Sequence, residues 1–255
     1  MNYQNEFKYA QKLVKEVFKK VNKSANLAIA EKGDRTLVTE MDVAIEDYLV
    51  YNVKLKYPKD HFITEERNPH NEMKDRTWVI DPIDGTACFI KGIPTWGIQL
   101  AFVDNEVVQF SIIYLPIIDE MYTCYRGQGV SLNGKKLSTP IDNPANICVT
   151  EYCGRIGISN REITAKIYEG IDDIVKNQLA FGASSCSFIN IVSGRCDAFI
   201  SGCKAPWDIC AGETMLVEQG CNIYKSKLGV SIYSNSSELF TILKKNIKII
   251  EKQYD

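Results

Sequence analysis

The sequence predicts a mixed α/β protein, and three observations indicate this class. Apolar residues recur at helical spacing near the N-terminus, strand-like runs joined by turns follow between residues 97 and 137, and short strand-like and helical runs alternate beyond residue 145. The chain has 255 residues, of which 45% are hydrophobic and 24% charged. This size and composition are typical of a globular protein with one large domain or two lobes that share a site.

Two helices and two short strands are predicted before residue 84. Helical spacing of apolar residues extends from about Asn5 to Ala30, and a loop follows. A second helix opens within Thr39–Asp42 and ends before Pro58. Strand patterns follow at His61–Glu65 and Trp78–Ile83, and a turn ends the second of them.

The pattern then changes to a set of strands and, later, to alternating strands and helices. The strands of this set are expected at residues 98–103, 107–114 and 120–125. Pro140–Ala145 is the best candidate boundary, which divides the chain into lobes of residues 1–140 and 141–255. In the second lobe we expect strands at 147–151, 198–201 and 222–224, and helices at 161–174, 187–193, 209–219 and 237–244.

Composition argues against several classes of function. The formal net charge of −2 gives no sign of a nucleic-acid or membrane surface, and the lysines at 15, 19, 20 and 23 are interpreted as a solvated helix face. The nine cysteines form no CxxC pair, so we expect a reduced, cytoplasmic protein without a disulfide framework. Neither a signal-peptide pattern nor an apolar run of membrane-spanning length is present.

The most informative stretch is Trp-Val-Ile-Asp-Pro-Ile-Asp-Gly-Thr at residues 78–86. Residues three apart on a regular strand point to opposite faces, but Pro82 favours a bend that lets Asp81 and Asp84 converge. Two carboxylates held close together repel each other unless a cation lies between them. Gly85 and Thr86 could then offer backbone N–H groups to a phosphate if a helix starts there. The stretch therefore indicates metal-dependent phosphate chemistry.

Other acidic residues and one glycine-containing segment could belong to the same site. Glu65 and Glu66 end a short strand, Asp42 lies near a helix start, and Asp208 precedes a helical run. Each also has a plainer interpretation: an exposed loop for the glutamates, a favourable helix dipole for Asp42, and an N-cap for Asp208. The segment 182–185, Gly-Ala-Ser-Ser, opens a helix and could offer amides to a ligand. Hard oxygen ligands of this kind suit Mg²⁺, and the chemistry needs no histidine, of which the chain has two.

Four segments of the chain together resemble the inositol monophosphatase family. Residues 78–86 and Trp-Asp-Ile-Cys-Ala-Gly at 207–212 are similar to the two signature motifs of this family. Leu-Val-Thr-Glu-Met-Asp at 37–42 and Phe-Ile-Thr-Glu-Glu at 62–66 look like its two upstream motifs. The resemblance spans nearly the whole chain, in the right order. The haloacid dehalogenase type of phosphatase is excluded, because it has one residue between its two aspartates, whereas two residues lie between Asp81 and Asp84.

The resemblance implies a layered α-β-α-β-α sandwich, as in inositol monophosphatases and fructose-1,6-bisphosphatases. It also implies a lithium-sensitive phosphomonoesterase that uses two or three Mg²⁺ ions per site, for which Mn²⁺ can substitute, and a homodimer. From the charge, we expect no nucleic-acid or membrane partner. By position, the first metal would be held by Glu65, Asp81 and the Ile83 carbonyl, and the second by Asp81, Asp84 and Asp208. Thr86, oriented by Asp42 and aided by Glu65, would position the attacking water. The Gly85 and Thr86 amides would hold the phosphate.

Departures from the family pattern concern the substrate. A glutamate that contacts inositol in animal enzymes is replaced by Ser201, and the family's Gly-Ser/Thr-Ala-Ala becomes Gly182-Ala183-Ser184-Ser185. Lys204 could attract a second anionic group of a bisphosphorylated sugar or nucleotide. The expected substrate is a small phosphorylated polyol or alcohol, nominally inositol monophosphate. Three other substrates stay open: histidinol phosphate, fructose 1,6-bisphosphate and 3′-phosphoadenosine 5′-phosphate. The first is included because residues 89–97 look like the corresponding stretch of histidinol-phosphate phosphatases. A non-catalytic metal- and ligand-binding role also stays open.

Overall fold

The computed structural model describes residues 2–21, 29–31, 37–138, 147–151, 158–172 and 174–253. Its helices are α1 (Gln4–Val21), α2 (Glu40–Lys56), α3 (Thr86–Ile90), α4 (Ile158–Ile171), α5 (Ser184–Val192), α6 (Pro206–Glu218) and α7 (Ser237–Glu251). Its strands are β1 (Ile29–Glu31), β2 (Leu37–Thr39), β3 (His61–Thr64), β4 (Thr77–Asp84), β5 (Gly97–Asp104), β6 (Val107–Leu115), β7 (Glu120–Tyr125), β8 (Val130–Leu132), β9 (Lys135–Lys136), β10 (Ile147–Glu151), β11 (Asn177–Leu179), β12 (Ala198–Ser201), β13 (Asn222–Lys225) and β14 (Ser231–Ser234).

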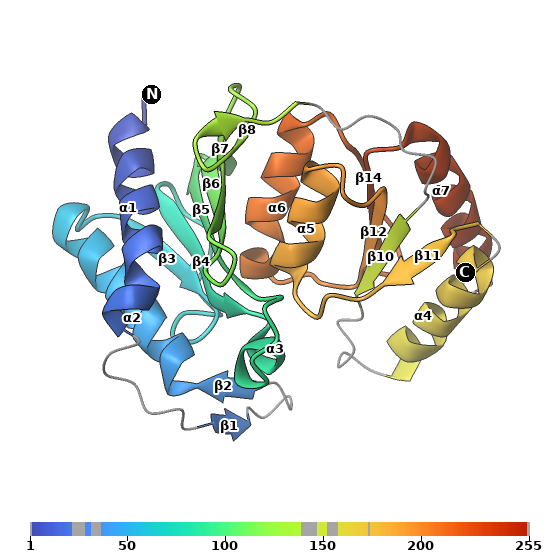
Figure 1. Cartoon of the computed structure of the whole chain (residues 1–255), viewed down its shortest axis with the longest axis horizontal. Helices are drawn as coiled ribbons and strands as arrows, with labels where there is room; N and C mark the ends of the chain where they lie inside the picture. Colours follow the sequence, from blue (N-terminus) through green and yellow to red (C-terminus); the bar gives the residue numbers. More distant parts are fainter. Residues whose placement is uncertain are drawn as a thin grey trace.

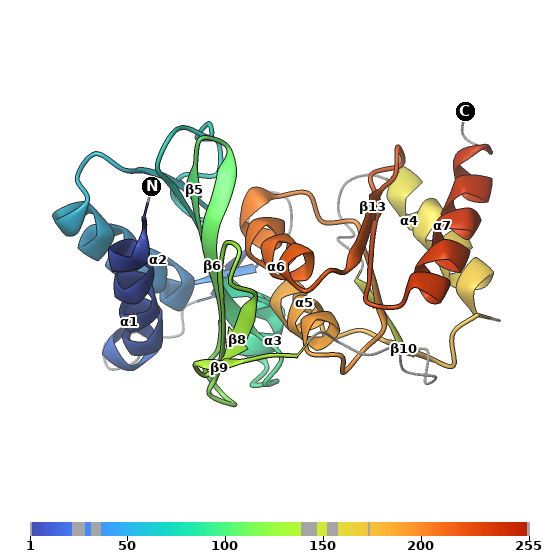
Figure 2. The same ribbon diagram turned by 90° about the horizontal axis from the view of Figure 1, so that it is seen from above.

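The elements form five alternating layers of helices and sheets (Figures 1 and 2). Helices α1 and α2 lie on the outer face of a seven-stranded sheet, and α5 and α6 lie between that sheet and a five-stranded one. Helices α4 and α7 cover the outer face of the five-stranded sheet. The predicted α-β-α-β-α sandwich is confirmed. The expected lobe boundary at residues 140–145 falls outside the described residues.

The seven-stranded sheet is buried on both faces at its centre. Its order is β3-β4-β5-β6-β7-β8-β9, with β3 and β4 parallel and the other pairs antiparallel. Every residue of β4 and β5 is buried. Alternate side chains point to opposite faces of a strand, so Trp78 packs on the side of α1 and α2, while Val79 packs on the side of α5 and α6. The sheet therefore holds β4, which carries Asp81 and Asp84, in a rigid position.

The five-stranded sheet has the order β11-β10-β12-β14-β13. β10 is parallel to both β11 and β12, whereas β12, β14 and β13 pair antiparallel. Phe199 of β12 packs with Phe188 of α5 on the inner face, and Ile200 packs on the outer face in the same cluster as Leu243 of α7. The inner contact places α5 and α6 firmly between the two sheets.

Two predicted elements differ from the structure. The first helix ends at Val21, and Ile29 and Ala30 belong instead to β1, which pairs antiparallel with β2, so the predicted helix is wrong at those two residues. The strand expected at Trp78–Ile83 is β4, which extends one residue further at each end and runs to Asp84, with a shift of register against β5 between Asp81 and Asp84. Such a bulge accommodates Pro82, which has no N–H to donate to a neighbouring strand.

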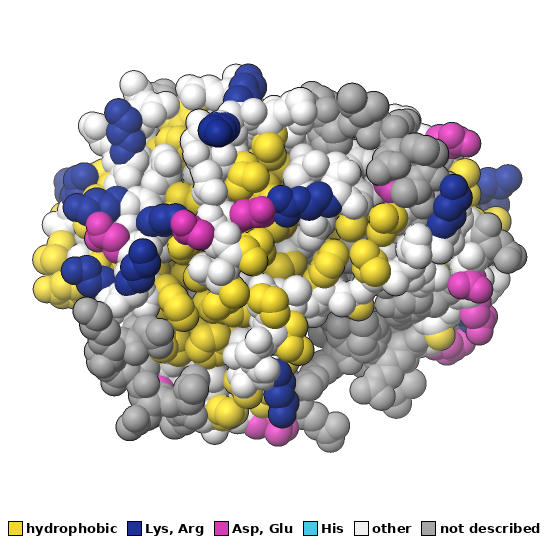
Figure 3. Space-filling view, in the orientation of Figure 1, with side chains coloured by type: hydrophobic (Ala, Val, Ile, Leu, Met, Phe, Trp, Pro, Cys, Tyr) yellow, Lys and Arg dark blue, Asp and Glu magenta, His cyan; other side chains and the backbone are white. Residues whose placement is uncertain are grey.

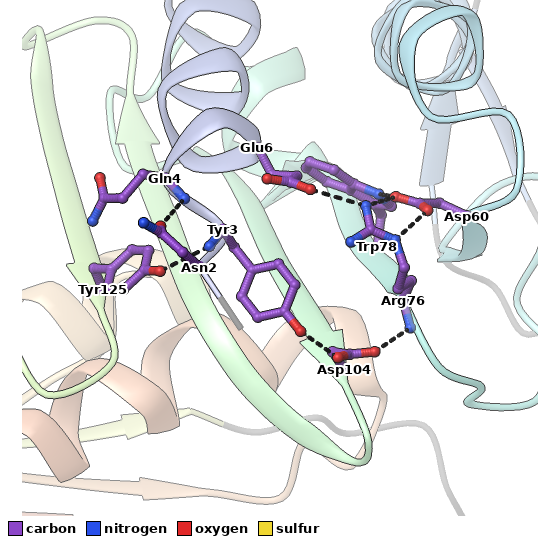
Figure 4. Close-up of polar contacts among 9 residues, drawn as sticks. All are labelled: Asn2, Tyr3, Gln4, Glu6, Asp60, Arg76, Trp78, Asp104 and Tyr125. Atoms are coloured by element: carbon purple, nitrogen blue, oxygen red, sulfur yellow. Dashed lines mark hydrogen bonds and ion pairs between the residues drawn. The ribbon is translucent and has the colours of Figure 1, made fainter.

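A polar network at the start of β4 attaches α1 to the seven-stranded sheet (Figure 4). Arg76 Nε donates to Asp60 Oδ1 at 2.7 Å, and its Nη2 donates to Glu6 Oε1 of α1 at 3.0 Å. Trp78 Nε1 donates to the other Asp60 oxygen at 2.8 Å, and Tyr3 Oη donates to Asp104. The network lies at the opposite end of β4 from Asp84, so it stabilises the strand without touching the acidic cluster.

The cysteines and the helices bear on two further expectations. Cys203 is disulfide-bonded, so the expectation of a fully reduced chain is wrong at this position, while seven other described cysteines carry free thiols. Among the described residues, we find no helix that is both long and apolar enough to cross a membrane.

Candidate active site

Three carboxylates from two layers of the fold converge at one point. Asp81 and Asp84 lie near the end of β4, and Asp208 lies in the first turn of α6. One oxygen from each lies within 4.8 Å of the others. Helix α6 begins with Pro206, preceded by Ala205 as the N-cap, so the alternative interpretation of Asp208 as an N-cap is wrong. The bulge in β4 is what brings Asp81 and Asp84 together, as the bend at Pro82 was expected to do.

The electrostatics of this cluster fit a bound cation. Burial raises the pKa of Asp81 well above its usual range, and the negative charges of Glu65 and Asp84 raise it further. Burial also raises the pKa of Asp84, against hydrogen bonds that lower it. Asp81 Oδ1 is buried and has no hydrogen-bond partner among the described residues. Oxygen-only donors held this close suit Mg²⁺, which would satisfy that oxygen and relieve the repulsion.

Helix α2 brings Asp42 to Thr86. Thr39 is the N-cap of α2 and forms a capping box with Asp42, whose Oδ2 accepts from the Thr39 amide at 2.8 Å. The other Asp42 oxygen, Oδ1, lies 3.1 Å from Thr86 Oγ1, which is also 3.2 Å from the Ile83 carbonyl oxygen. Burial raises the pKa of Asp42, although the hydrogen bonds from Thr39 and Thr86 oppose this. Asp42 therefore both caps a helix and orients the Thr86 hydroxyl.

Glu65 lies close enough to Asp81 for its charge to raise the pKa of Asp81. The loop that carries Glu65 is held by a buried carboxylate that the sequence did not reveal. Glu46, one turn after Asp42 in α2, is fully buried. Its carboxylate accepts from Thr64 Oγ1 at 2.6 Å and from the amides of Glu66 and Arg67 at 2.8 Å each. The spacing of four residues from Asp42 was the available signal, because such residues share a helix face.

The starts of α3 and α5 meet beside the cluster. Gly85, the N-cap of α3, has φ 92°, and a Cβ there would lie 2.8 Å from Ala183 Cβ, so only glycine fits. Ala183 is the N-cap of α5, after Gly182. The Ser184 and Ser185 amides donate to Asp84 at 3.2 and 2.5 Å. These two amides are therefore already engaged by the aspartate and do not point to a phosphate.

Two predicted substrate residues have contacts elsewhere. Ser201 is 1% exposed, and its hydroxyl accepts from the Cys203 amide at 3.0 Å. Lys204 is exposed, and its side chain lies over the turn at Gly229, where an added Cβ would be 2.3 Å from Lys204 Nζ. These contacts do not join either residue to the carboxylate cluster.

A layered fold with two sheets and a buried carboxylate cluster that suits a cation is typical of metal-dependent phosphatases, and comparison with known proteins specifies the family. The model of the inositol monophosphatase family matches residues 2–252. The chain therefore belongs to this family and is a phosphomonoester hydrolase.

Relatives and solved structures with different names are similar to the chain. It is 31% identical to Nus factor SuhB of Salmonella typhimurium over 75% of this chain and 72% of the relative. It is 30% identical to a fructose-1,6-bisphosphatase/inositol-1-monophosphatase of Thermotoga maritima (74% and 71%) and to a histidinol-phosphatase of Chlorobaculum parvum (77% and 75%). The solved structure of an IMPase/NADP phosphatase with Mg²⁺ and phosphate matches 94% of this chain and 93% of its own, with a TM-score of 0.78 and 20% identity.

Proposed function

We propose that this protein is a Mg²⁺-dependent phosphatase of a small phosphorylated polyol or alcohol, nominally inositol monophosphate. The observation that carries the proposal is the convergence of Asp81, Asp84 and Asp208, together with a buried Asp81 oxygen that has no hydrogen-bond partner among the described residues. Burying such a cluster without a cation is unfavourable, so the fold provides a binding site for a divalent ion.

Glu65, Asp81 and the Ile83 carbonyl would hold one ion, and Asp81, Asp84 and Asp208 would hold a second. Bound Mg²⁺ would lower the pKa of a water and neutralise charge on the phosphoryl group. Two or three ions per site, with Mn²⁺ as a substitute, are part of the proposal. Asp81 would contribute to both ion sites, and this double role would account for its buried oxygen, which has no hydrogen-bond partner among the described residues.

Thr86 would position the attacking water for in-line displacement at phosphorus. Its hydroxyl donates to Asp42 Oδ1, which leaves an oxygen lone pair to accept a hydrogen bond from the water. Glu65, held beside Asp81, would assist from the other side. The Gly85 and Thr86 amides would bind the phosphate, and residues 182–184 would line the same pocket. The closeness of Gly182 and Ala183 to Gly85 supports this proposal.

A second candidate substrate is histidinol phosphate. The relative from Chlorobaculum parvum carries that name, and residues 89–97 resemble the corresponding stretch of such enzymes. Fructose 1,6-bisphosphate and 3′-phosphoadenosine 5′-phosphate are the other candidate substrates, and together with inositol monophosphate and histidinol phosphate they form a panel for assay. Ser201 and Lys204 stay proposed specificity residues, and comparison of monophosphates with bisphosphates tests Lys204.

Phosphate release from this panel tests the proposal. Purified protein with Mg²⁺ should hydrolyse at least one phosphomonoester, and EDTA should abolish the activity. Asp84→Asn should lower turnover by about two orders of magnitude or more while the protein stays folded, because the ligand loses its charge. Asp172→Asn, which alters an exposed carboxylate after α4, is the matched control. Full activity of Asp84→Asn would refute the metal assignment.

A homodimer and sensitivity to lithium are also proposed. Hydrophobic side chains gather around α3 on the face shown in Figure 3. Exposed residues in this part of the chain include Ile93, which follows α3 and is 46% exposed. Such a patch is typical of a contact surface. Light scattering during gel filtration tests the dimer, and a titration with LiCl tests the inhibition; a monomer or an unaffected rate would contradict the respective proposal.

A further inference from the structure

Two buried polar side chains outside the predicted ligand set connect β5, α5 and α6 behind the carboxylates. Gln99 of β5 is 1% exposed and lies opposite Asp81 in the β4–β5 register. Ser184, the first residue of α5, is 2% exposed. Neither was singled out as a neighbour of the metal ligands, because 85 residues separate them in sequence.

Hydrogen bonds join this pair to both ends of the acidic cluster. Gln99 Nε2 donates to Ser184 Oγ at 2.8 Å and to the Asp208 carbonyl oxygen at 3.3 Å. Ser184 Oγ lies 3.2 Å from Asp84 Oδ1 and 3.0 Å from the Asp208 carbonyl oxygen. A carbonyl oxygen can only accept, so the amide nitrogen of Gln99 must face it. The Ser184 hydroxyl, which accepts from Gln99, then directs its single hydrogen to Asp84 or Asp208.

We propose that Gln99 and Ser184 act together as a positioning pair that fixes Asp84 and the first turn of α6 for binding a divalent ion. The inference rests on the proposed metal site. In the family pattern the hydroxyl stands at the position of Ala183, whereas here it stands one residue later, at Ser184. The displaced hydroxyl contacts Asp84, a proposed metal ligand.

A positioning pair is needed because the proposed metal ligands come from separate layers of the fold. Asp84 belongs to the sheet and Asp208 to a helix packed on it, so a small shift of α6 changes the distance between their oxygens. Apolar packing fixes such a distance less sharply than directional hydrogen bonds do. Gln99 and Ser184 supply directional bonds to both layers, and their own burial excludes competing water.

Binding of Mn²⁺ measured by calorimetry tests this role in Ser184→Ala and in Gln99→Met, which is close to isosteric. We expect each variant to bind Mn²⁺ about tenfold more weakly, as is typical when a residue that orients a metal ligand is removed. If the pair acts as a unit, the double variant should bind no more weakly than either single variant. At saturating Mg²⁺ the KM for the substrate should stay unchanged in Gln99→Met, because Gln99 is not among the residues proposed to line the substrate pocket.

Ser187→Ala is the matched control, since it removes another buried hydroxyl of α5, one that donates to the Ala183 carbonyl. It should bind Mn²⁺ with wild-type affinity. Wild-type affinity in both Ser184→Ala and Gln99→Met, equal weakening in Ser187→Ala, or a raised KM of Gln99→Met at saturating Mg²⁺ would each overturn the inference. Wild-type protein that binds no Mn²⁺ would instead overturn the proposed function. Melting temperatures in EDTA identify any variant that has lost its fold. If either Ser184→Ala or Gln99→Met is unfolded, the Mn²⁺ affinity of the other variant tests the inference.

Discussion

Glu46→Gln should impair both stability and catalysis, although Glu46 is not a proposed metal ligand. The wild-type carboxylate is surrounded by three donors: Thr64 Oγ1, and the amides of Glu66 and Arg67. Thr64 Oγ1 itself accepts from the Asn68 amide, so its hydrogen is directed to Glu46. A glutamine has one oxygen and one NH₂ group, and it can therefore satisfy only one side of this arrangement.

The magnitude follows from the geometry. A glutamine oxygen at the position of Glu46 Oε1 keeps two contacts, of 2.6 and 2.8 Å. The NH₂ group then faces the Glu66 amide, which lies 2.8 Å from Oε2, donor against donor. Loss of one charge-assisted hydrogen bond with a donor left unsatisfied costs about 2–4 kcal/mol. A shift of the neighbouring Glu65 by about 1 Å would lower kcat/KM by about a hundredfold.

Thermal unfolding and phosphate release measure the two effects. For a chain of this size, the loss corresponds to a fall in melting temperature of roughly 10 °C. Asp47→Asn is the matched control, because Asp47 bonds Arg67 of the same loop at 3.1 Å but with both side chains more than half exposed. It should change stability by less than about 0.5 kcal/mol and leave turnover unchanged. Wild-type melting and turnover in Glu46→Gln would refute the role of this carboxylate.

Three further predictions concern stability. Arg76→Met should lower the free energy of unfolding in urea by about 3–5 kcal/mol, because it leaves the buried carboxylates of Asp60 and Glu6 without their cation; a loss below 1 kcal/mol would contradict this. Arg195 holds the pKa of Glu120 below its usual range, so this pair stabilises the fold fully above about pH 4.3 and the contribution disappears as the pH falls through the lower folded-state pKa. Arg195→Met should therefore show a shallower acid-side loss of stability than wild type, and an equal slope would count against the assignment. Mg²⁺ at a hundred times its Kd should stabilise the protein by about 2.7 kcal/mol, EDTA should reverse this, and an unchanged melting temperature would mean that no ion binds the folded state.

Local sequence patterns predicted those features that local chemistry decides. The start of α2 follows from Thr39 and Asp42, whose capping box closes within four residues. Most strands of the seven-stranded sheet were found because they are long enough to show a pattern. Strands of two or three residues, such as β8 and β9, were missed, because periodicity has no meaning over so short a run.

The supporting shell of the site was not predictable in the same way. Asp84 and Ser184 are 100 residues apart, and each looks locally ordinary: a strand end and a helix start. From sequence, a serine at a helix start is interpreted as a cap or a ligand donor. Its contact with an aspartate is visible only in the structure, where the start of α5 bonds Asp84. Proline at the bend indicated convergence of Asp81 and Asp84, but the bulge that achieves it depends on pairing with β5.

The distribution of hydrogen bonds among the carboxylates implies that the ion enters a site that is already formed. Asp84 is held by two backbone amides and a hydroxyl, and Asp42 by its capping box, whereas Asp81 has a buried oxygen with no partner among the described residues. If binding had to organise the cluster, the flanking ligands would also lack fixed partners. Because Asp84 and Asp42 already have fixed partners, an ion bound at Asp81 would gain its oxygen without ordering these two neighbours. Most of the free energy of ion binding would then appear as affinity, and by the inference above that affinity would depend on how accurately Gln99 and Ser184 hold the helix that carries Asp208.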